Sequence, residues 1–271
     1  MKITLWYQRL GAAGFRTNVL FKYNRGVKEF IYGRNAVYET LRARRRQLFG
    51  LQIAVGVKAA GRVTDIMELA ARQKVPATLV PRAKLDKLGA NHQGVALEAG
   101  DYPYSDVIEI MERSGSKGEL PFVLIIDSLQ DPQNFGVLLR TAEIVGVHGV
   151  VIPLARAVGV TPAVVNASAG ATEHLLIAQS NLSQAIDALK DSDVWIVGLD
   201  QEGEIATEAA DRHLRGSVGL VVGSEGEGLH QLTRKKCDLL LRLPMKGQVE
   251  SLNASVAGSV ALYLAYMARN K

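Results

Sequence analysis

The second half of the sequence restricts the fold most, because short apolar runs alternate there with stretches of helical periodicity. The apolar runs are continuous, which is typical of strands that are covered on both faces of a sheet. They are expected at residues 122–126, 149–152, 194–199, 218–222 and 239–243, with helices at 136–145, 162–171, 182–190 and 229–236 and a final helix over about 251–268. This order predicts an α/β fold with a mostly parallel sheet.

Ahead of this domain, which we place at residues 121–271, the sequence divides into three parts. Residues 29–99 read as a small α/β domain, with strands expected at 51–55, 77–80 and 94–99 and a helix at 63–73. Residues 100–120 contain turn-forming residues and a short helix around 107–112, and are expected to be a linker. Residues 1–28 contain six basic residues and no acidic ones. We interpret this basic extension as a poorly ordered tail, with a targeting segment or a misplaced start as alternatives.

The charge is unevenly distributed along the chain. Residues 1–120 contain 20 Lys and Arg against 11 Asp and Glu, whereas residues 121–271 contain 12 against 16. A basic part beside an acidic part favours a polyanionic partner for the basic one. Without residues 1–28 the excess falls to +3, so charge alone leaves the question open. The small domain offers five candidate phosphate-binding residues, although a simple exposed helix end explains the last four equally well: Arg34, Arg42, Arg44, Arg45 and Arg46.

Composition excludes several classes of protein. Cys237 is the single cysteine, so neither an internal disulfide nor a cysteine-based zinc cluster is possible within the chain. The sequence has no metal-binding motif of the His-Glu-x-x-His type, and its histidines are scattered, so we assign none of them a catalytic role. No apolar run reaches about 18 residues, so neither a transmembrane helix nor a membrane partner is expected. The cysteine content favours a reducing cytosol.

Three segments combine glycine and polar residues directly after a predicted strand, which is where open α/β sheets bind ligands. The first spans residues 127–143. It contains Asn134, a candidate cap of the following helix, and Arg140, whose place near the strand end makes it a candidate phosphate ligand.

The second and third segments are ambiguous when each is taken alone. Residues 221–229 hold three glycines, beginning at Gly223, that let a ligand approach the backbone closely. Their spacing fits neither a dinucleotide fingerprint nor a P-loop, and a tight turn explains this segment better on its own. Residues 243–257 offer Ser251 as a candidate N-cap of the last helix, and Asn253 is a poor helix former without another role.

Together, the three segments resemble the motifs of the SpoU/TrmH methyltransferases in order and spacing. The motifs are Asn-x-Gly-x-x-x-Arg from residue 134, Gly-x-Glu-x-x-Gly from residue 223, and Pro-Met-x-Gly-x-x-x-Ser-Leu-Asn-x-Ser-Val-Ala from residue 244. Residues 30–99 are similar to a small RNA-binding domain, related to ribosomal protein L30, that a subgroup of this family carries. Within the family the chain looks most like the bacterial large-subunit rRNA guanosine-2′-O-methyltransferases.

The resemblance implies a fold, a cofactor and a set of residue roles. The C-terminal domain is expected to be a SPOUT domain with a trefoil knot that forms the S-adenosylmethionine site, and two subunits are expected to pair beside it as a homodimer. Gly223, Leu243 and Leu252 are expected to line the cofactor pocket. The catalytic neighbourhood is expected to need no metal and to contain Asn134, Arg140, Glu225, Ser251 and Asn253, with Arg140 central.

The expected reaction is methyl transfer to a ribose 2′-hydroxyl of structured RNA, a guanosine of 23S rRNA, in the cytoplasm. Arginine stays protonated in proteins, so we expect Arg140 to hold a phosphate and stabilise oxyanion charge rather than to act as the base. The alternatives are a tRNA ribose methyltransferase and, in a different class, a non-catalytic RNA-binding factor of ribosome assembly. A nucleotide-dependent dehydrogenase is disfavoured because the glycine fingerprint is missing.

Overall fold

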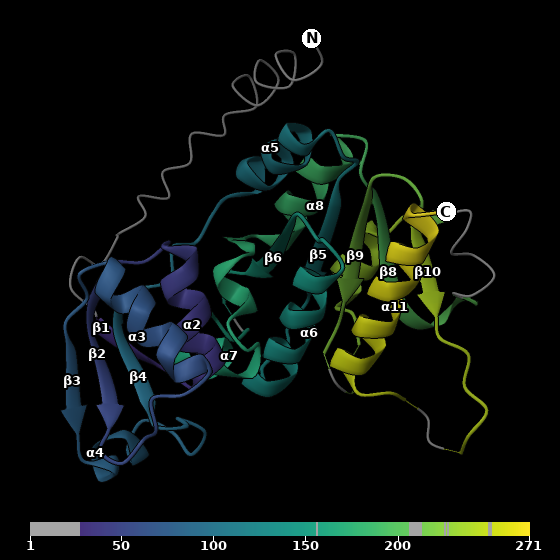
Figure 1. Ribbon diagram of the computed structural model, residues 1–271. Coiled ribbons are helices and arrows are strands. Elements are labelled where there is room, and N and C mark those ends of the chain that lie inside the picture. Colours follow the sequence, from purple (N-terminus) through teal and green to yellow (C-terminus); the bar gives the residue numbers. More distant parts are fainter. Residues whose placement is uncertain (1–27, 156, 206–212, 225, 227, 249–250) are drawn as a thin grey trace.

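The computed structural model describes residues 28–271 except 156, 206–212, 225, 227 and 249–250, so almost all of the predicted basic extension lies outside the described residues. The described strands form two sheets, one in each half of the chain, and helices surround both (Figure 1). The mixed α/β class predicted from the sequence is confirmed.

The N-terminal domain packs two helices against one face of a four-stranded sheet. Its strands are β1 (Lys28–Tyr32), β2 (Leu48–Ala54), β3 (Ala77–Val80) and β4 (Val95–Gly100), in the order β1-β4-β2-β3. β4 runs antiparallel to β1 and β2, whereas β3 is parallel to β2. Helices α2 (Arg34–Ala43) and α3 (Arg62–Arg72) cover the sheet with buried apolar side chains. The sequence pattern does not predict β1 or the short helix α4 (Arg82–Asp86).

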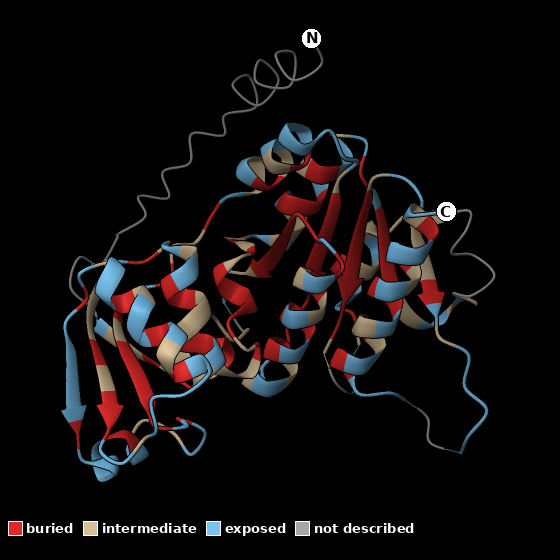
Figure 2. Ribbon diagram, in the orientation of Figure 1, coloured by how far each residue is buried: buried red, intermediate tan, exposed pale blue. Residues whose placement is uncertain are grey.

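The C-terminal domain contains the parallel sheet that the apolar runs predict. Its strands are β5 (Phe122–Ile126), β6 (Gly149–Pro153), β7 (Leu176–Ser180), β8 (Trp195–Ile205), β9 (Val218–Val222) and β10 (Leu239–Arg242), in the order β10-β8-β9-β5-β6-β7. Every neighbouring pair is parallel. Every residue of β5 and β9 is buried, as continuous apolar strands require (Figure 2). The edge strand β7 is not predicted by the sequence pattern.

Helices cover both faces of this sheet, because alternate side chains of β5 point to opposite sides. Phe122, Leu124 and Ile126 pack with α6 (Pro132–Ile144), α7 (Pro162–Ala167) and α11 (Ala254–Arg269). Val123 and Ile125 pack with α5 (Val107–Lys117) and α8 (Leu182–Lys190), and α10 (Gln231–Lys236) lies against α8. α5 is longer than the short helix expected in residues 100–120, and its Ile110 is buried among the strands.

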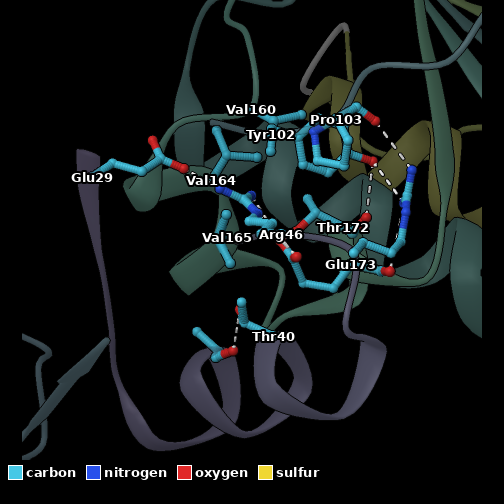
Figure 3. Close-up of polar contacts among 12 residues, drawn as sticks. Glu29, Thr40, Arg46, Tyr102, Pro103, Val160, Val164, Val165, Thr172 and Glu173 are labelled. Carbon is cyan, nitrogen blue, oxygen red and sulfur yellow. Dashed lines mark hydrogen bonds and ion pairs between the residues drawn. The ribbon is translucent and has the colours of Figure 1, made fainter. Parts of the chain in front are cut away.

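The two domains meet in a buried interface that centres on Arg46 (Figure 3). The Arg46 side chain has no exposed surface and binds the equally buried Glu173 through two hydrogen bonds, Nη2 to Oε1 at 2.8 Å and Nε to Oε2 at 3.0 Å. Glu173 belongs to the 3₁₀ helix η1 (Ala171–Glu173) of the C-terminal domain. Arg46 also forms an ion pair with Glu29 of β1. Its guanidinium therefore connects a strand of the N-terminal sheet to the η1 helix of the C-terminal domain.

Two of the five candidate RNA-binding arginines are therefore committed elsewhere. Arg45 donates to the backbone oxygens of Pro103, at 3.2 Å, and of Leu175, so it lies in the interface beside Arg46. For the fully buried Arg46 the predictions of an RNA contact and of an exposed helix end are both wrong, and Arg45 is half-buried rather than exposed. Whether a basic run faces solvent depends on how domains dock, which local sequence does not reveal. Arg42 and Arg44 are exposed.

Candidate functional site

The three motif segments all begin at the carboxyl edge of the C-terminal sheet. β5 is followed by β6 on one side, whereas β9 lies on its other side, so the direction of travel across the sheet reverses beside β5. Open α/β sheets bind ligands at such a switch point. Asp127 follows β5, Gly223 follows β9 and Leu243 follows β10. The start of α11, which belongs to the same edge, lies in the lower part of Figure 1.

Polar side chains join the starts of α6 and α11 at this edge. Asn253 Nδ2 donates to Asn134 Oδ1 at 3.1 Å, and Ser255 Oγ donates to the same oxygen at 3.3 Å. The structure thereby brings the first and third motif segments together, although Asn134 and Asn253 are 119 positions apart. Thr141 and Ser259, whose hydroxyl oxygens are 2.9 Å apart, join the same two helices further along.

The capping roles considered for Asn134 and Ser251 are both wrong. Asp131 caps α6, since its carboxylate accepts from the backbone N–H of Gln133 at 3.3 Å and of Asn134 at 3.0 Å. Asn253 caps α11 by accepting from the N–H of Ser255 at 2.9 Å, and Ser251 is exposed ahead of the helix. With another residue capping α6, the Asn134 side chain turns towards α11.

Arg140 lies on the outer face of α6, six residues beyond Asn134, and is exposed. Val137 and Ile144, which are 45% and 58% exposed, share that face because side chains three or four residues apart lie together on a helix. The Arg140 guanidinium is therefore accessible from solvent.

The glycine-rich loop after β9 folds back on itself. Ser224 N donates to Gly228 O at 3.0 Å, and Gly228 N donates to Ser224 O at 3.2 Å. A Cβ at Gly223 would lie 2.2 Å from Gly228 O, so only glycine fits there. Gly226 has a φ of 90°, in the region that favours glycine. Glu225, the acidic residue of this motif, lies outside the described residues.

Asp127 and His230 fasten the end of that loop to β5, and the sequence analysis missed both. The buried Asp127 carboxylate accepts from the backbone N–H of His230 at 2.8 Å, and its Oδ1 lies 2.8 Å from the ring Nδ1. Ser128 Oγ lies 3.4 Å from the same nitrogen. A Ser-His-Asp relay needs the serine at the other ring nitrogen, so these residues position a loop instead. An aspartate directly after a buried strand was the signal that could have found them.

The segment after β10 presents apolar side chains beside open space. Leu243 is half-buried, while Met245 and Leu252 are 45% and 44% exposed. A Cβ at Gly247 would meet no atom within 4 Å. Within the described part of the chain, no three His, Cys, Asp or Glu residues gather to hold a metal ion.

Comparison with known proteins identifies the family. Residues 121–263 match the SpoU rRNA Methylase family, and this range covers more than half of the chain and all three motif segments. The chain belongs to the SpoU rRNA methylase family. Residues 30–105 of this SpoU protein match a second family, described as RNA 2′-O ribose methyltransferase substrate binding.

Relatives and solved structures agree with this membership. The SpoU chain is 41% identical over 244 residues to a TrmH family tRNA/rRNA methyltransferase of Bacillus subtilis, covering 89% of this chain and 96% of the relative. A Staphylococcus epidermidis relative of the same description is 41% identical over 243 residues. The crystal structure of the SpoU methyltransferase AviRb from Streptomyces viridochromogenes, in complex with AdoMet, superimposes with a TM-score of 0.75 at 22% identity over 99% of this chain and 98% of that chain. That likeness supports the SpoU-type fold predicted from the motifs.

None of the helices in the described ranges is long and apolar enough to cross a bilayer.

Proposed function

We propose that this SpoU protein transfers a methyl group from S-adenosylmethionine to a ribose 2′-hydroxyl of structured RNA. The observation that carries the proposal is the contact of Asn134 with Asn253 at the switch-point edge, where the glycine loop also begins. Transfer between two bound molecules requires donor and acceptor to be held together. Motif segments from three strand ends that gather at one edge provide that arrangement.

The residues at this edge fit the proposed cofactor. At Gly226 a Cβ would meet no atom within 4 Å, so the main chain there is open to a ligand, whereas Gly223 lets the loop pack closely against Gly228. Leu243 and Leu252 offer partly exposed apolar surface to an adenine ring. When bound, the cofactor supplies a methyl group that its sulfonium makes electrophilic. In the proposal, Gly223, Leu243 and Leu252 hold and orient it.

Arg140 is the residue that we assign to the RNA. Its guanidinium holds a phosphate of the target nucleotide and stabilises negative charge as it develops on the 2′-oxygen. Because arginine stays protonated, the hydroxyl proton passes to a phosphate oxygen of the RNA or to water. In the proposal, Asn134 and Asn253 join the helix starts beside the transfer site. We assign Glu225 and Ser251 to the same catalytic neighbourhood on the motif match alone.

We also propose a homodimer that forms through α6 and α11. An apolar stripe along α11 is 41% to 57% exposed and has helical spacing, at Val256, Val260, Tyr263 and Met267. Val137 and Ile144 of α6 extend it on either side of Arg140. An exposed apolar patch of this extent over two packed helices is typical of an interface between protein chains.

Light scattering tests the dimer. Val260→Asp should convert a dimer to a monomer, because it places a charge within the apolar stripe. Leu79→Asp is the matched control, since Leu79 is 73% exposed on β3 of the other domain. A wild-type monomer, or a Val260→Asp dimer, would overturn this interface.

A guanosine of 23S rRNA is the proposed target, and a tRNA ribose is the alternative; both are RNAs of the cytoplasm. The match of residues 30–105 to a family described as RNA 2′-O ribose methyltransferase substrate binding supports an RNA substrate. The relatives' description as tRNA/rRNA methyltransferases keeps tRNA as the second candidate.

Transfer of tritiated methyl from labelled S-adenosylmethionine to unmodified total RNA tests the function. Label in 23S rRNA, recovered as an alkali-resistant dinucleotide that begins with guanosine, is the expected result. Label confined to tRNA would show that the substrate is a tRNA ribose and not 23S rRNA. No label from a protein that binds both RNA and the cofactor would favour the non-catalytic assembly factor.

A further inference from the structure

The end of strand β8 carries a further inference, which rests on the proposed function. β8 lies between β9 and β10 in the sheet order, and Figure 1 shows the three strands side by side. We assign Gly223, directly after β9, and Leu243, directly after β10, to the cofactor. The end of β8 therefore lies between two parts of the proposed cofactor site.

β8 leaves both neighbouring strands and then returns to β10. Gly198 pairs with Leu240 of β10, but the next residue of β10 pairs with Glu204. Residues 199–203 therefore have no partner in the ladder to β10, and the ladder to β9 has already ended at Gly198. We call residues 199–203 the β8 bulge. The pairing that follows the bulge ends one residue before Leu243, so the bulge lies close to the proposed site.

The β8 bulge returns to β10 by a close approach of the two backbones. A Cβ at Gly203 would lie 2.5 Å from the backbone carbon and oxygen of Leu240, so only glycine fits at this point. The return is thus fixed by steric contact. The earlier residues of the bulge are outside both ladders, so side-chain contacts have to hold them.

Arg234 of α10 holds the bulge through two carboxylates. Its Nε lies 3.0 Å from Asp200 Oδ2, and its Nη2 donates to Glu202 Oε2. Asp200 Oδ1 accepts from the backbone N–H of Glu202 at 2.9 Å. The Asp200 side chain is 16% exposed, whereas that of Glu202 is 76% exposed, so the pair with Asp200 is the better shielded from water. Arg234 and Asp200 together therefore define the shape of the bulge.

The helix that carries Arg234 is fixed at both ends. α10 begins directly after His230, whose backbone N–H donates to the Asp127 carboxylate at 2.8 Å. Two residues after the helix, the backbone N–H of Asp238 donates to the Ile196 oxygen at 2.8 Å, and its carboxylate accepts from the Ile196 N–H at 2.8 Å. Arg234 thus reaches the bulge from a support that is tied to the end of β5 and to β8.

The effect of Arg234 is expected to be local. Ion pairs of partly exposed side chains contribute little to the free energy of unfolding, and the Arg234 side chain is 37% exposed. The pair nevertheless restrains a segment that lies outside the strand ladders. A ligand binds more tightly to a segment that is already ordered, because binding then does not have to restrict its motion.

We propose that Arg234 is a positioning residue for the cofactor. It holds the β8 bulge in one conformation as a wall of the S-adenosylmethionine site, between the ends of β9 and β10. This preorganisation raises the affinity for the cofactor. Arg234 acts through Asp200 and does not itself touch the cofactor.

Isothermal titration with S-adenosylmethionine tests this role. Arg234→Gln should weaken the affinity about fivefold, because the bulge must then be ordered during binding. With RNA as acceptor, the KM for the cofactor should rise by the same factor while kcat stays within about twofold of wild type. Lys235→Gln is the matched control, since it removes the same charge from the next, exposed residue of α10 and should change the affinity by less than about twofold. Equal affinities of wild type and Arg234→Gln would overturn the inference.

A double-mutant cycle tests whether Arg234 acts through Asp200. Asp200→Asn alone should weaken binding as Arg234→Gln does, and the double variant should bind no more weakly than either single one, because both changes break the same pair. Arg234→Lys keeps a positive charge beside Asp200 and should recover part of the affinity. Additive losses, or no recovery with lysine, would contradict the assigned route.

Hydrogen exchange of the cofactor-free protein separates local positioning from a general loss of structure. Arg234→Gln should speed the exchange of the amides at 199–203 about tenfold and leave those of β9 unchanged. Faster exchange in β9 as well would refute a local role. Titration and exchange need neither RNA nor turnover. A wild-type protein that binds S-adenosylmethionine without methylating RNA would therefore refute the proposed function and leave this test valid.

Discussion

The two ends of helix α2 carry arginines that look alike in the sequence and differ completely in the structure. Arg34 at its start borders a pocket and keeps surface towards solvent. Arg46, shortly after its end, is wholly buried and bound to Glu173. The first is placed to meet a ligand, whereas the second holds two domains together. The contrast shows that the packing of the other domain, and not local charge, assigns the role of a basic residue.

The largest effect on stability is expected at the buried end. Arg46→Ala leaves the Glu173 carboxylate buried without its partner, which should lower the free energy of unfolding by about 3–5 kcal/mol. Urea denaturation measures this. Arg42→Ala is the control, because Arg42 is 62% exposed in its pair with Glu39, and it should cost less than about 0.5 kcal/mol. Similar losses in both variants would show that burial does not separate the two arginines.

In the C-terminal domain, the exposed Arg140 is a third case, because we assign it a role in the methyl-transfer reaction and none in stability. Arg140→Ala should reduce kcat by about 10²–10³ because a charge that stabilises the transition state is removed. The urea midpoint should not change. Isothermal titration should show unchanged affinity for S-adenosylmethionine, and a lost cofactor affinity would refute the assignment of Arg140 to the RNA.

The sequence predicted the parallel sheet well because burial on both faces forces strands to be continuously apolar, as in β5 and β9. The edge strand β7 was not predicted because its apolar run is short, since only two of its five residues are fully buried. The resemblance implied that Asn134 and Asn253 share one neighbourhood, and their side chains are in contact in the structure. Their catalytic role stays a prediction. The trefoil knot remains a prediction from the resemblance.

The finer details of the site were not predictable from local pattern. Near the start of α6 the sequence suggested Asn134 as the cap, whereas in the structure the Asp131 carboxylate accepts the N–H groups. Asp127 and His230 are 103 positions apart and become partners only through the sheet order. The burial of Arg45 and Arg46 likewise depends on how the two domains pack together, which hydrophobic periodicity does not predict.

The cap of α11 offers a smaller and sharper comparison between two neighbouring polar residues. Asn253→Ala should lower the free energy of unfolding by about 1 kcal/mol, because the cap and the hydrogen bond to Asn134 are both lost. Ser251→Ala should cost less than about 0.5 kcal/mol, because Ser251 is exposed and caps nothing. Thermal denaturation of the two variants measures the difference. A larger loss from Ser251→Ala would restore the cap suggested by the sequence.

The smallest expected effect on stability concerns His148. Like Arg46 its side chain is buried, but unlike Arg46 it is buried in the neutral form. Burial lowers the pKa of His148 below its ordinary value of 6.5. Its Nδ1 accepts from the backbone N–H of Phe122 at 3.0 Å, so that nitrogen carries no proton in the fold. Its Nε2 lies 2.9 Å from Glu119 Oε2 and carries the single ring proton.

The direction of the pH dependence follows from these contacts. As pH falls below 6.5, the histidine of the unfolded chain takes up a proton before the folded one does, so the unfolded state gains stability. The free energy of unfolding should therefore be fully retained above that pH and decline towards the lower pKa of the folded protein. Urea denaturation at about pH 7.5 and about pH 5.5 measures the decline, and His148→Gln, which does not titrate there, should reduce it. An equal decline in the variant would mean that other groups cause it and that His148 does not resist protonation in the fold.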